Sequence, residues 1–255
     1  MVMRFVIIFL FCFSCSTSLI KDESSLVKFN NAMKYIEDSK YSKAIDELEY
    51  LLLIDPLSEY SSNAQYFLAE SYYNLENYDK AILEFEKYLS RRSLSNDLLK
   101  KTQLYLCKCY YSVTLDYNKD PSSTYIAIEK LQYFIEKESM KEYVNEIEGM
   151  ILKLRTKLAK KNFYNAKLYI RLEEFNSAVI YYSTVIKEYY DTEFVNDSLI
   201  NVAIIYFLES KQKSISYLKN QKRNFISNND YEIAITFIDN LELDQETEYY
   251  ISQLK

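Results

Sequence analysis

The sequence predicts an all-α fold built from repeated helix–turn–helix units. Five times, a small residue is followed three positions later by tyrosine: at Ala32/Tyr35, Ala69/Tyr72, Cys107/Tyr110, Ala166/Tyr169 and Ala203/Tyr206. The steps between the small residues are 37, 38, 59 and 37. Three of the five motifs are followed twelve residues on by a second alanine, at Ala44, Ala81 and Ala178. Such a period is typical of paired helices that approach closely through small residues.

Composition supports helices and argues against catalysis. The chain has 255 residues, 49% of them hydrophobic, with one glycine, two prolines and no histidine. Hairpin sheets of this size and phosphate-binding loops both need glycine, and histidine is the commonest general base and metal ligand. An AT-rich genome would also give this composition, with the same consequence for chemistry. We therefore expect no enzyme, no cofactor and no metal.

The repeats resemble the tetratricopeptide (TPR) family over roughly residues 25–224. The resemblance implies a superhelical solenoid of about five helix–turn–helix repeats. Their approximate bounds are 26–56, 60–92, 96–138, 159–190 and 194–224. An extra helix before repeat four, at about 141–158, accounts for the long step. Residues 225–255 are expected to form a capping helix or a tail.

Individual segments carry their own signals. The second helix of repeat one, at 41–54, is amphipathic, and Asp55-Pro56 should end it because proline disfavours helix in the preceding residue. Repeat three carries an insertion from Asp116 to Thr124. In repeat five, Ser214 replaces the second alanine.

The N-terminus has the pattern of a bacterial lipoprotein signal. One arginine precedes an apolar run from Phe5 to Phe13, which is too short to span a bilayer, and Ser14-Cys15 follows. The pattern resembles a lipobox, which implies cleavage after residue 14, acylation of Cys15 and a tether over 15–24. Cys12 is a poorer candidate, and the alternative is a signal cleaved without lipidation. Ser16 implies the outer membrane by analogy with enteric bacteria.

Only Cys107 and Cys109 then remain in the mature domain. Two residues apart on one helix, their side chains diverge by about 200°, which makes a disulfide between them implausible. Cys107 takes the small-residue position of its repeat and is expected in the core. A metal site would need further Cys or His ligands, which the mature chain lacks.

The order of elements is similar to that of the BamD (ComL/YfiO) family, the TPR lipoproteins of the outer-membrane β-barrel assembly (Bam) machinery. The matching residues are Asp116, Asp120, Thr124 and Ala127, then Arg155, Leu158 and Ala159. The family often places Tyr-Pro after a helix pair, where this chain has Tyr189-Tyr190. The resemblance implies a scaffold that binds BamA, other Bam subunits and unfolded outer-membrane proteins.

Two surfaces are candidates for binding. The first helix of each TPR repeat lines a groove, and two groove positions per repeat hold Phe29, Met33, Tyr66, Glu70, Phe163 and Lys167. These residues either bind an extended client peptide or pack between helices.

The second candidate surface is a basic segment. Residues 211–223 hold five basic residues and no acid, whereas 230–248 hold seven acids and no base. The basic residues Lys211, Lys213, Lys219, Lys222 and Arg223 could dock an acidic partner or anionic lipid head groups, or they could form a solvated helix face.

Two functions follow. The first is a Bam scaffold lipoprotein on the periplasmic face of the outer membrane. The second is another periplasmic TPR lipoprotein that coordinates cell-envelope or peptidoglycan synthesis. The compartment and the formal charge of −6 disfavour nucleic acid.

Overall fold

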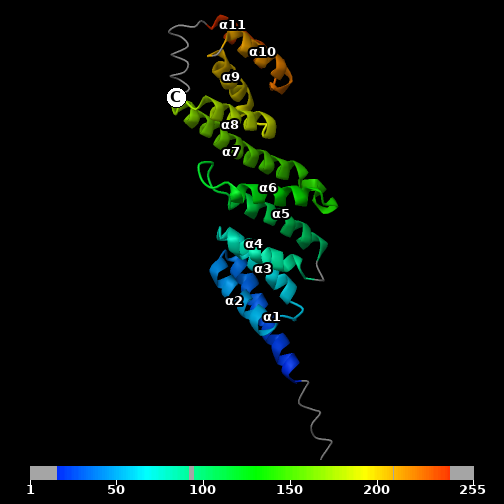
Figure 1. The fold of residues 1–255 in the computed structure, drawn as a ribbon. Helices are drawn as coiled ribbons and strands as arrows, with labels where there is room; N and C mark the ends of the chain where they lie inside the picture. Colours follow the sequence, from blue (N-terminus) through cyan, green and yellow to red (C-terminus); the bar gives the residue numbers. More distant parts are fainter. Residues whose placement is uncertain (1–15, 92–94, 209, 242–255) are drawn as a thin grey trace, which may run out of the picture. The chain divides into compact units, whose positions relative to one another are not determined.

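The computed structural model describes residues 16–91, 95–208 and 210–241 (Figure 1). The regular structure of these residues is α-helical and 3-10 helical, without a strand among them, and antiparallel helix pairs follow one another in TPR order. The predicted all-α TPR fold is confirmed. The signal segment 1–14 and Cys15 lie outside the described residues.

The helices are α1 (Ser16–Glu37), α2 (Tyr41–Ile54), α3 (Ser61–Asn74), α4 (Tyr78–Leu89), α5 (Asn96–Ser112), α6 (Ser122–Ile135), η1 (Glu138–Tyr143), α7 (Val144–Arg171), α8 (Phe175–Glu188), α9 (Phe194–Phe207), α10 (Lys211–Gln221), η2 (Lys222–Asn224) and α11 (Asn228–Asn240).

The chain divides into two compact units. Unit 1 comprises Met1–Val113 and Tyr133–Tyr143, and unit 2 comprises Thr114–Gln132 and Val144–Lys255. In unit 1, α1 packs on α2, α2 on α3, α3 on α4, and α4 on α5. In unit 2, the same succession runs from α7 to α11. The division falls inside repeat three, since α5 belongs to unit 1 and the inserted loop to unit 2.

The small residues of the repeat motif lie at the helix contacts. All eight are fully buried: Ala32, Ala44, Ala69, Ala81, Cys107, Ala166, Ala178 and Ala203. Cys107 is therefore a core residue, and neither it nor Cys109 forms a disulfide. Ser214 is also fully buried, and its hydroxyl donates to the Ala203 carbonyl oxygen at 2.7 Å. That hydrogen bond explains how serine fills an alanine position in the core without an unpaired hydroxyl.

The motif tyrosines connect one repeat to the next in unit 1. The Tyr72 hydroxyl in α3 donates to Glu49 in α2 at 2.6 Å. One period later, the Tyr110 hydroxyl in α5 donates to Glu86 in α4 at 2.7 Å. The repeated tyrosine thus packs between units of the repeat and hydrogen-bonds to a carboxylate 23 residues before it in one case and 24 in the other.

The first helix of repeats one, two and four ends in the same left-handed turn. Ser39, Glu76 and Glu173 have φ between 57° and 60°, a region that glycine adopts more readily than other residues. In repeat two, the Asn77 amide donates to the Tyr72 carbonyl and the Glu76 amide to the Tyr73 carbonyl, at 3.0 and 2.9 Å. The motif tyrosine is therefore the residue whose carbonyl closes the helix. This explains why the second helix begins six residues after it, at Tyr78.

Replacing Glu76 with glycine is expected to stabilise the protein. Glu76 is exposed and has φ of 58°, so glycine would relieve the strain of a side chain in the left-handed region. Part of the gain is offset by the larger conformational freedom of glycine in the unfolded chain. The expected net increase in the free energy of unfolding is about 0.5–1 kcal/mol. Urea unfolding followed by circular dichroism measures it, and a lower midpoint than the parent's would contradict this account of the turn.

The end of α2 and the 59-residue distance between the small residues Cys107 and Ala166 agree with the sequence predictions. α2 ends at Ile54, and Asp55 leaves the helical region with φ of −143° and ψ of 70°. The expected extra helix is present, and it continues without interruption into the first helix of repeat four as the 28-residue α7. Gly149 does not break it. A Cβ there would meet nothing within 4 Å, so no close approach in the described chain requires glycine.

The last described helix covers repeat five. α11 packs against α9 and α10 in unit 2 and buries Tyr231, Ala234 and Ile238. Its N-terminus is capped by Ser227, whose hydroxyl accepts from the Asp230 amide at 3.1 Å. Residues 242–255 lie outside the described residues.

Candidate functional site

The six predicted groove residues differ in accessibility. Tyr66 is 2% and Phe163 is 9% exposed, so both are buried. The other four, Phe29, Met33, Glu70 and Lys167, are partly buried.

Tyr66 is held on several sides within unit 1. Its ring lies 5.2 Å from Phe67, 6.0 Å from Phe85 and 5.7 Å from Tyr88, measured between centroids. Its hydroxyl donates to Glu70 at 3.0 Å, and burial raises the pKa of the phenol. Tyr66 therefore packs within the stack, as the second of the two sequence interpretations predicts.

Phe163 is packed in the same way in unit 2. Its ring lies 5.5 Å from Tyr182 and 5.3 Å from Phe194. Phe29, by contrast, is only partly buried and stacks on Tyr60 at 5.5 Å, next to Phe67 at 6.1 Å. Among the three predicted groove aromatics, Phe29 is therefore the one that a ligand could reach most readily.

The basic segment is partly engaged by the acidic helix α11. Lys222 forms an ion pair with Glu232 at 3.6 Å and lies 4.5 Å from the centroid of Tyr231. The Lys211 ammonium donates to the Asp239 carbonyl oxygen. Part of the charge asymmetry noted in the sequence is thus satisfied within the chain.

The remaining three cations extend towards solvent to different degrees. Lys213 lies over the ring of Tyr206 at 4.6 Å. Lys219 and Arg223 are exposed, the first on α10 and the second in η2. These two are the best placed of the five predicted docking residues to meet a partner.

The inserted loop of repeat three lies against α7. Lys157 donates to the Thr114 hydroxyl at 2.7 Å, and Lys161 donates to the Lys119 carbonyl at 2.9 Å. Between them, Lys160 lies 4.5 Å from the centroid of Tyr117. Lysines at this helical spacing share one face. The long insertion is therefore held by one face of α7, an arrangement that the sequence analysis did not identify.

Arg155 fastens the turn after α8 to α7. Its guanidinium donates to both carboxylate oxygens of Asp191, with contacts of 2.7–3.0 Å, and to the Glu188 carbonyl oxygen at 2.7 Å. The rings of Tyr189 and Tyr190 lie 5.6 and 5.7 Å from it. Arginine thus caps a helix C-terminus and holds the turn that follows.

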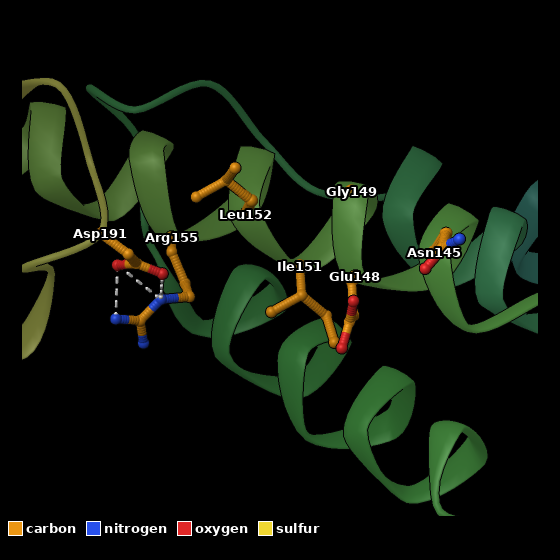
Figure 2. Close-up of a pocket in the computed structure, with 7 residues that line it drawn as sticks. All are labelled: Asn145, Glu148, Gly149, Ile151, Leu152, Arg155 and Asp191. Atoms are coloured by element: carbon orange, nitrogen blue, oxygen red, sulfur yellow. Dashed lines mark hydrogen bonds and ion pairs between the residues drawn. The ribbon is translucent and has the colours of Figure 1, made fainter.

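A shallow hollow of about 540 Å³ extends along α7 from this ion pair. Figure 2 shows Arg155 and Asp191 facing one another at one end, with the other lining residues spaced along the helix. The lining residues are Asn145, Glu148, Gly149, Ile151, Leu152, Arg155 and Asp191. The arginine and the aspartate are paired with one another, and the aliphatic side chains of Ile151 and Leu152 give the hollow apolar packing surface.

Replacing Arg155 with alanine is expected to lower the free energy of unfolding of unit 2 by about 1–2 kcal/mol, because a bidentate pair and a helix cap are lost together. Arg155→Lys should recover only part of this, since an ammonium cannot contact both carboxylate oxygens and the Glu188 carbonyl in the same way. Urea unfolding measures both variants. Equal midpoints for all three proteins would contradict the assigned role.

The same pair predicts a pH effect. The hydrogen bond from Arg155 lowers the pKa of the Asp191 carboxyl below its ordinary value. The contribution of the pair to stability is therefore present above the unfolded-state pKa, about 3.9, and is lost as pH falls through the lower folded-state value. The destabilisation caused by Arg155→Ala should accordingly shrink in acid.

Nothing in the described residues assembles a metal or thiol site. No group of three or more Cys, Asp or Glu side chains among them is placed to hold a metal ion. Burial raises the pKa of the Cys109 thiol to about 12, which keeps it protonated and unreactive near neutral pH.

A family model described as an outer membrane lipoprotein, YfiO, matches residues 21–221. The chain belongs to the YfiO family. The match takes in every helix from α2 to α10. No helix in the described part of the chain is long and apolar enough to cross a membrane.

Other comparisons add little to the YfiO assignment. No curated protein matches the chain. A crystal structure of a tetratricopeptide repeat protein from Parabacteroides merdae ATCC 43184 is 10% identical, with a TM-score of 0.31 over 91% of this chain and 98% of that one. At that score the likeness supports no further conclusion.

Proposed function

We propose that this YfiO-family chain is a non-catalytic scaffold subunit of the β-barrel assembly machinery that binds BamA. The observation that carries the proposal is the family match over 21–221. The structure is compatible with it, because the described residues form successive packed helix pairs. Such a stack offers extended surfaces for proteins to bind.

BamA is proposed to bind repeats four and five, with Lys219 and Arg223 as the charged contacts. Both side chains are exposed, whereas Lys211 and Lys222 contact α11. An acidic surface on the partner would complement them. Unfolded outer-membrane proteins are proposed to bind unit 1, where the partly buried Phe29 lies beside Tyr60. Acylation of Cys15 would hold the chain on the periplasmic face of the outer membrane, since several acyl chains give a stable anchor.

Reversing the two exposed charges tests the docking surface. Lys219→Glu/Arg223→Glu should reduce co-purification of BamA by roughly tenfold or more, because like charges across an interface repel. The fold should be unaffected, as both residues are exposed. Association of the parent protein should also weaken with salt, since the Debye length falls from about 10 Å at 0.1 M to about 3 Å at 1 M.

A matched control shows whether a loss of BamA binding is due to these two positions or to the change in the net charge of the protein. Lys101→Glu/Lys153→Glu makes the same change in charge at two other exposed lysines, in α5 and α7. It should leave co-purification near the parent level. Equal losses in both variants would contradict a specific role for Lys219 and Arg223.

The second candidate, a coordinator of cell-envelope or peptidoglycan synthesis, would use the same anchor and helix stack with different partners. It takes precedence if the full-length protein never associates with BamA.

A further inference from the structure

The two most exposed large hydrophobic side chains of the described residues belong to one short segment. Leu57 is 93% exposed and Leu53 is 79% exposed. Leu53 lies in the last turn of α2, and Leu57 follows Pro56 in the turn where the Ser58 amide donates to the Asp55 carbonyl at 3.2 Å. We call residues 53–57 the leucine turn. Single exposed leucines are common on protein surfaces, but two within one turn form a local apolar projection.

The leucine turn lies at the end of repeat one that leads towards Cys15. The Ser25 hydroxyl in α1 donates to the Asp55 carboxylate at 3.1 Å, which fixes the two segments side by side. Because α1 and α2 are antiparallel, the first residues of α1 extend beyond the end of α2 (Figure 1). α1 begins at Ser16, directly after Cys15. Nine residues at 1.5 Å per residue put Ser25 about 14 Å along the helix from Ser16, the first residue of α1.

We propose that the leucine turn is a second membrane contact, inserted into the lipid interface next to the anchor. The inference rests on the acylation of Cys15 put forward in the proposed function. A headgroup layer is about 5–8 Å thick, so an upright α1 would lift the leucine turn clear of the lipid. Insertion therefore requires α1 to lie along the membrane, and it fixes the orientation of repeat one at the surface.

The surrounding charges identify the kind of lipid surface. Lys28 is paired with Glu47 at 2.8 Å, Asp55 accepts from Ser25, and Glu59 is exposed. This set has no excess positive charge to attract anionic headgroups. The contact therefore depends on burial of aliphatic surface in a neutral, zwitterionic interface. It should be insensitive to salt, unlike the proposed docking of BamA.

An environment-sensitive fluorophore on Glu59→Cys tests the contact and leaves both leucines in place. The full-length acylated protein is reconstituted in phosphatidylcholine vesicles containing nitroxide-labelled lipid. Leu83→Cys, at a 51% exposed position in α4, is the control site. Cys107 and Cys109 are buried, and the parent protein measures their background labelling.

We expect lipid quenching at position 59 to exceed that at position 83 by roughly twofold or more, because interfacial insertion brings the label within reach of the nitroxides. In a Leu53→Ser/Leu57→Ser background, quenching at 59 should fall to the level at 83. Equal quenching at the two sites, or quenching that survives the double substitution, would overturn the inference. So would a response at 59 that appears only when a protein partner is added.

Two further measurements distinguish a failure of the leucine-turn inference from a failure of the proposed function. Intact mass of the same preparation shows whether Cys15 carries acyl chains, and their absence would refute the anchor itself. With the acyl chains present, a lack of quenching refutes only the leucine-turn contact. BamA should co-purify with the Leu53→Ser/Leu57→Ser protein as it does with the parent.

Discussion

Tyr66→Ala should lower the free energy of unfolding of unit 1 by about 3–5 kcal/mol, the usual cost of removing a buried aromatic ring. Tyr66 is 2% exposed and contacts the rings of Phe67, Phe85 and Tyr88. Its removal leaves a cavity between α3 and α4 that helices fixed by Ala69 and Ala81 can close only partly. Since whole domains are stable by about 5–15 kcal/mol, this one change should move the urea midpoint far towards zero.

Tyr66→Phe is the matched control. It keeps the ring and removes only the hydrogen bond to Glu70, so the expected loss is about 0.5–1.5 kcal/mol. A small effect of the alanine variant would mean that the ring does not fill the space between these helices. The result also bears on client binding, because loss of binding by Tyr66→Ala would report unfolding. Phe29→Ala, at a partly buried position, is the informative variant for the client surface.

Ending the chain after residue 190 should abolish co-purification with BamA. The truncation removes α9, α10 and α11, and with them Lys219 and Arg223. It also exposes the face of α8 that carries the buried Tyr182 and Val185, so unit 2 should lose part of its structure. Unit 1 should remain folded and protected from protease, because its core lies within 1–113 and 133–143.

A chain that ends after residue 241 is the control for the truncation. It keeps every described helix and removes only residues outside the described part. BamA should bind it as it binds the full chain. If the chain that ends after residue 190 still binds BamA, the contact region lies within repeats one to four, and the assignment to repeat five with Lys219 and Arg223 is wrong.

The repeat architecture could be predicted from sequence because close packing of paired helices requires small residues at regular positions. Ala69 and Ala81 must be small for two helices to approach, and both are fully buried. The proline after Asp55 marked the end of α2 for a local backbone reason. The left-handed turns were not predicted. Such positions are usually occupied by glycine, whereas this chain has Ser39, Glu76 and Glu173 there.

Contacts between distant segments could not be predicted in the same way. Arg155 was noted as part of a family pattern, but its bidentate contact with Asp191 spans 36 residues and leaves no periodic signal. The engagement of Lys222 by Glu232 likewise depends on how α11 folds back over repeat five. For Tyr66, the groove position and the packing position coincide in sequence, and only its burial decided between them.

The most direct test of the scaffold assignment is recovery of the full-length protein from its native membrane, followed by identification of what accompanies it. We predict that BamA is present at 0.1 M salt and is depleted at 1 M, as expected for contacts made by exposed charges. Full-length protein that carries its acyl chains and never brings BamA with it would contradict the account and favour the envelope coordinator.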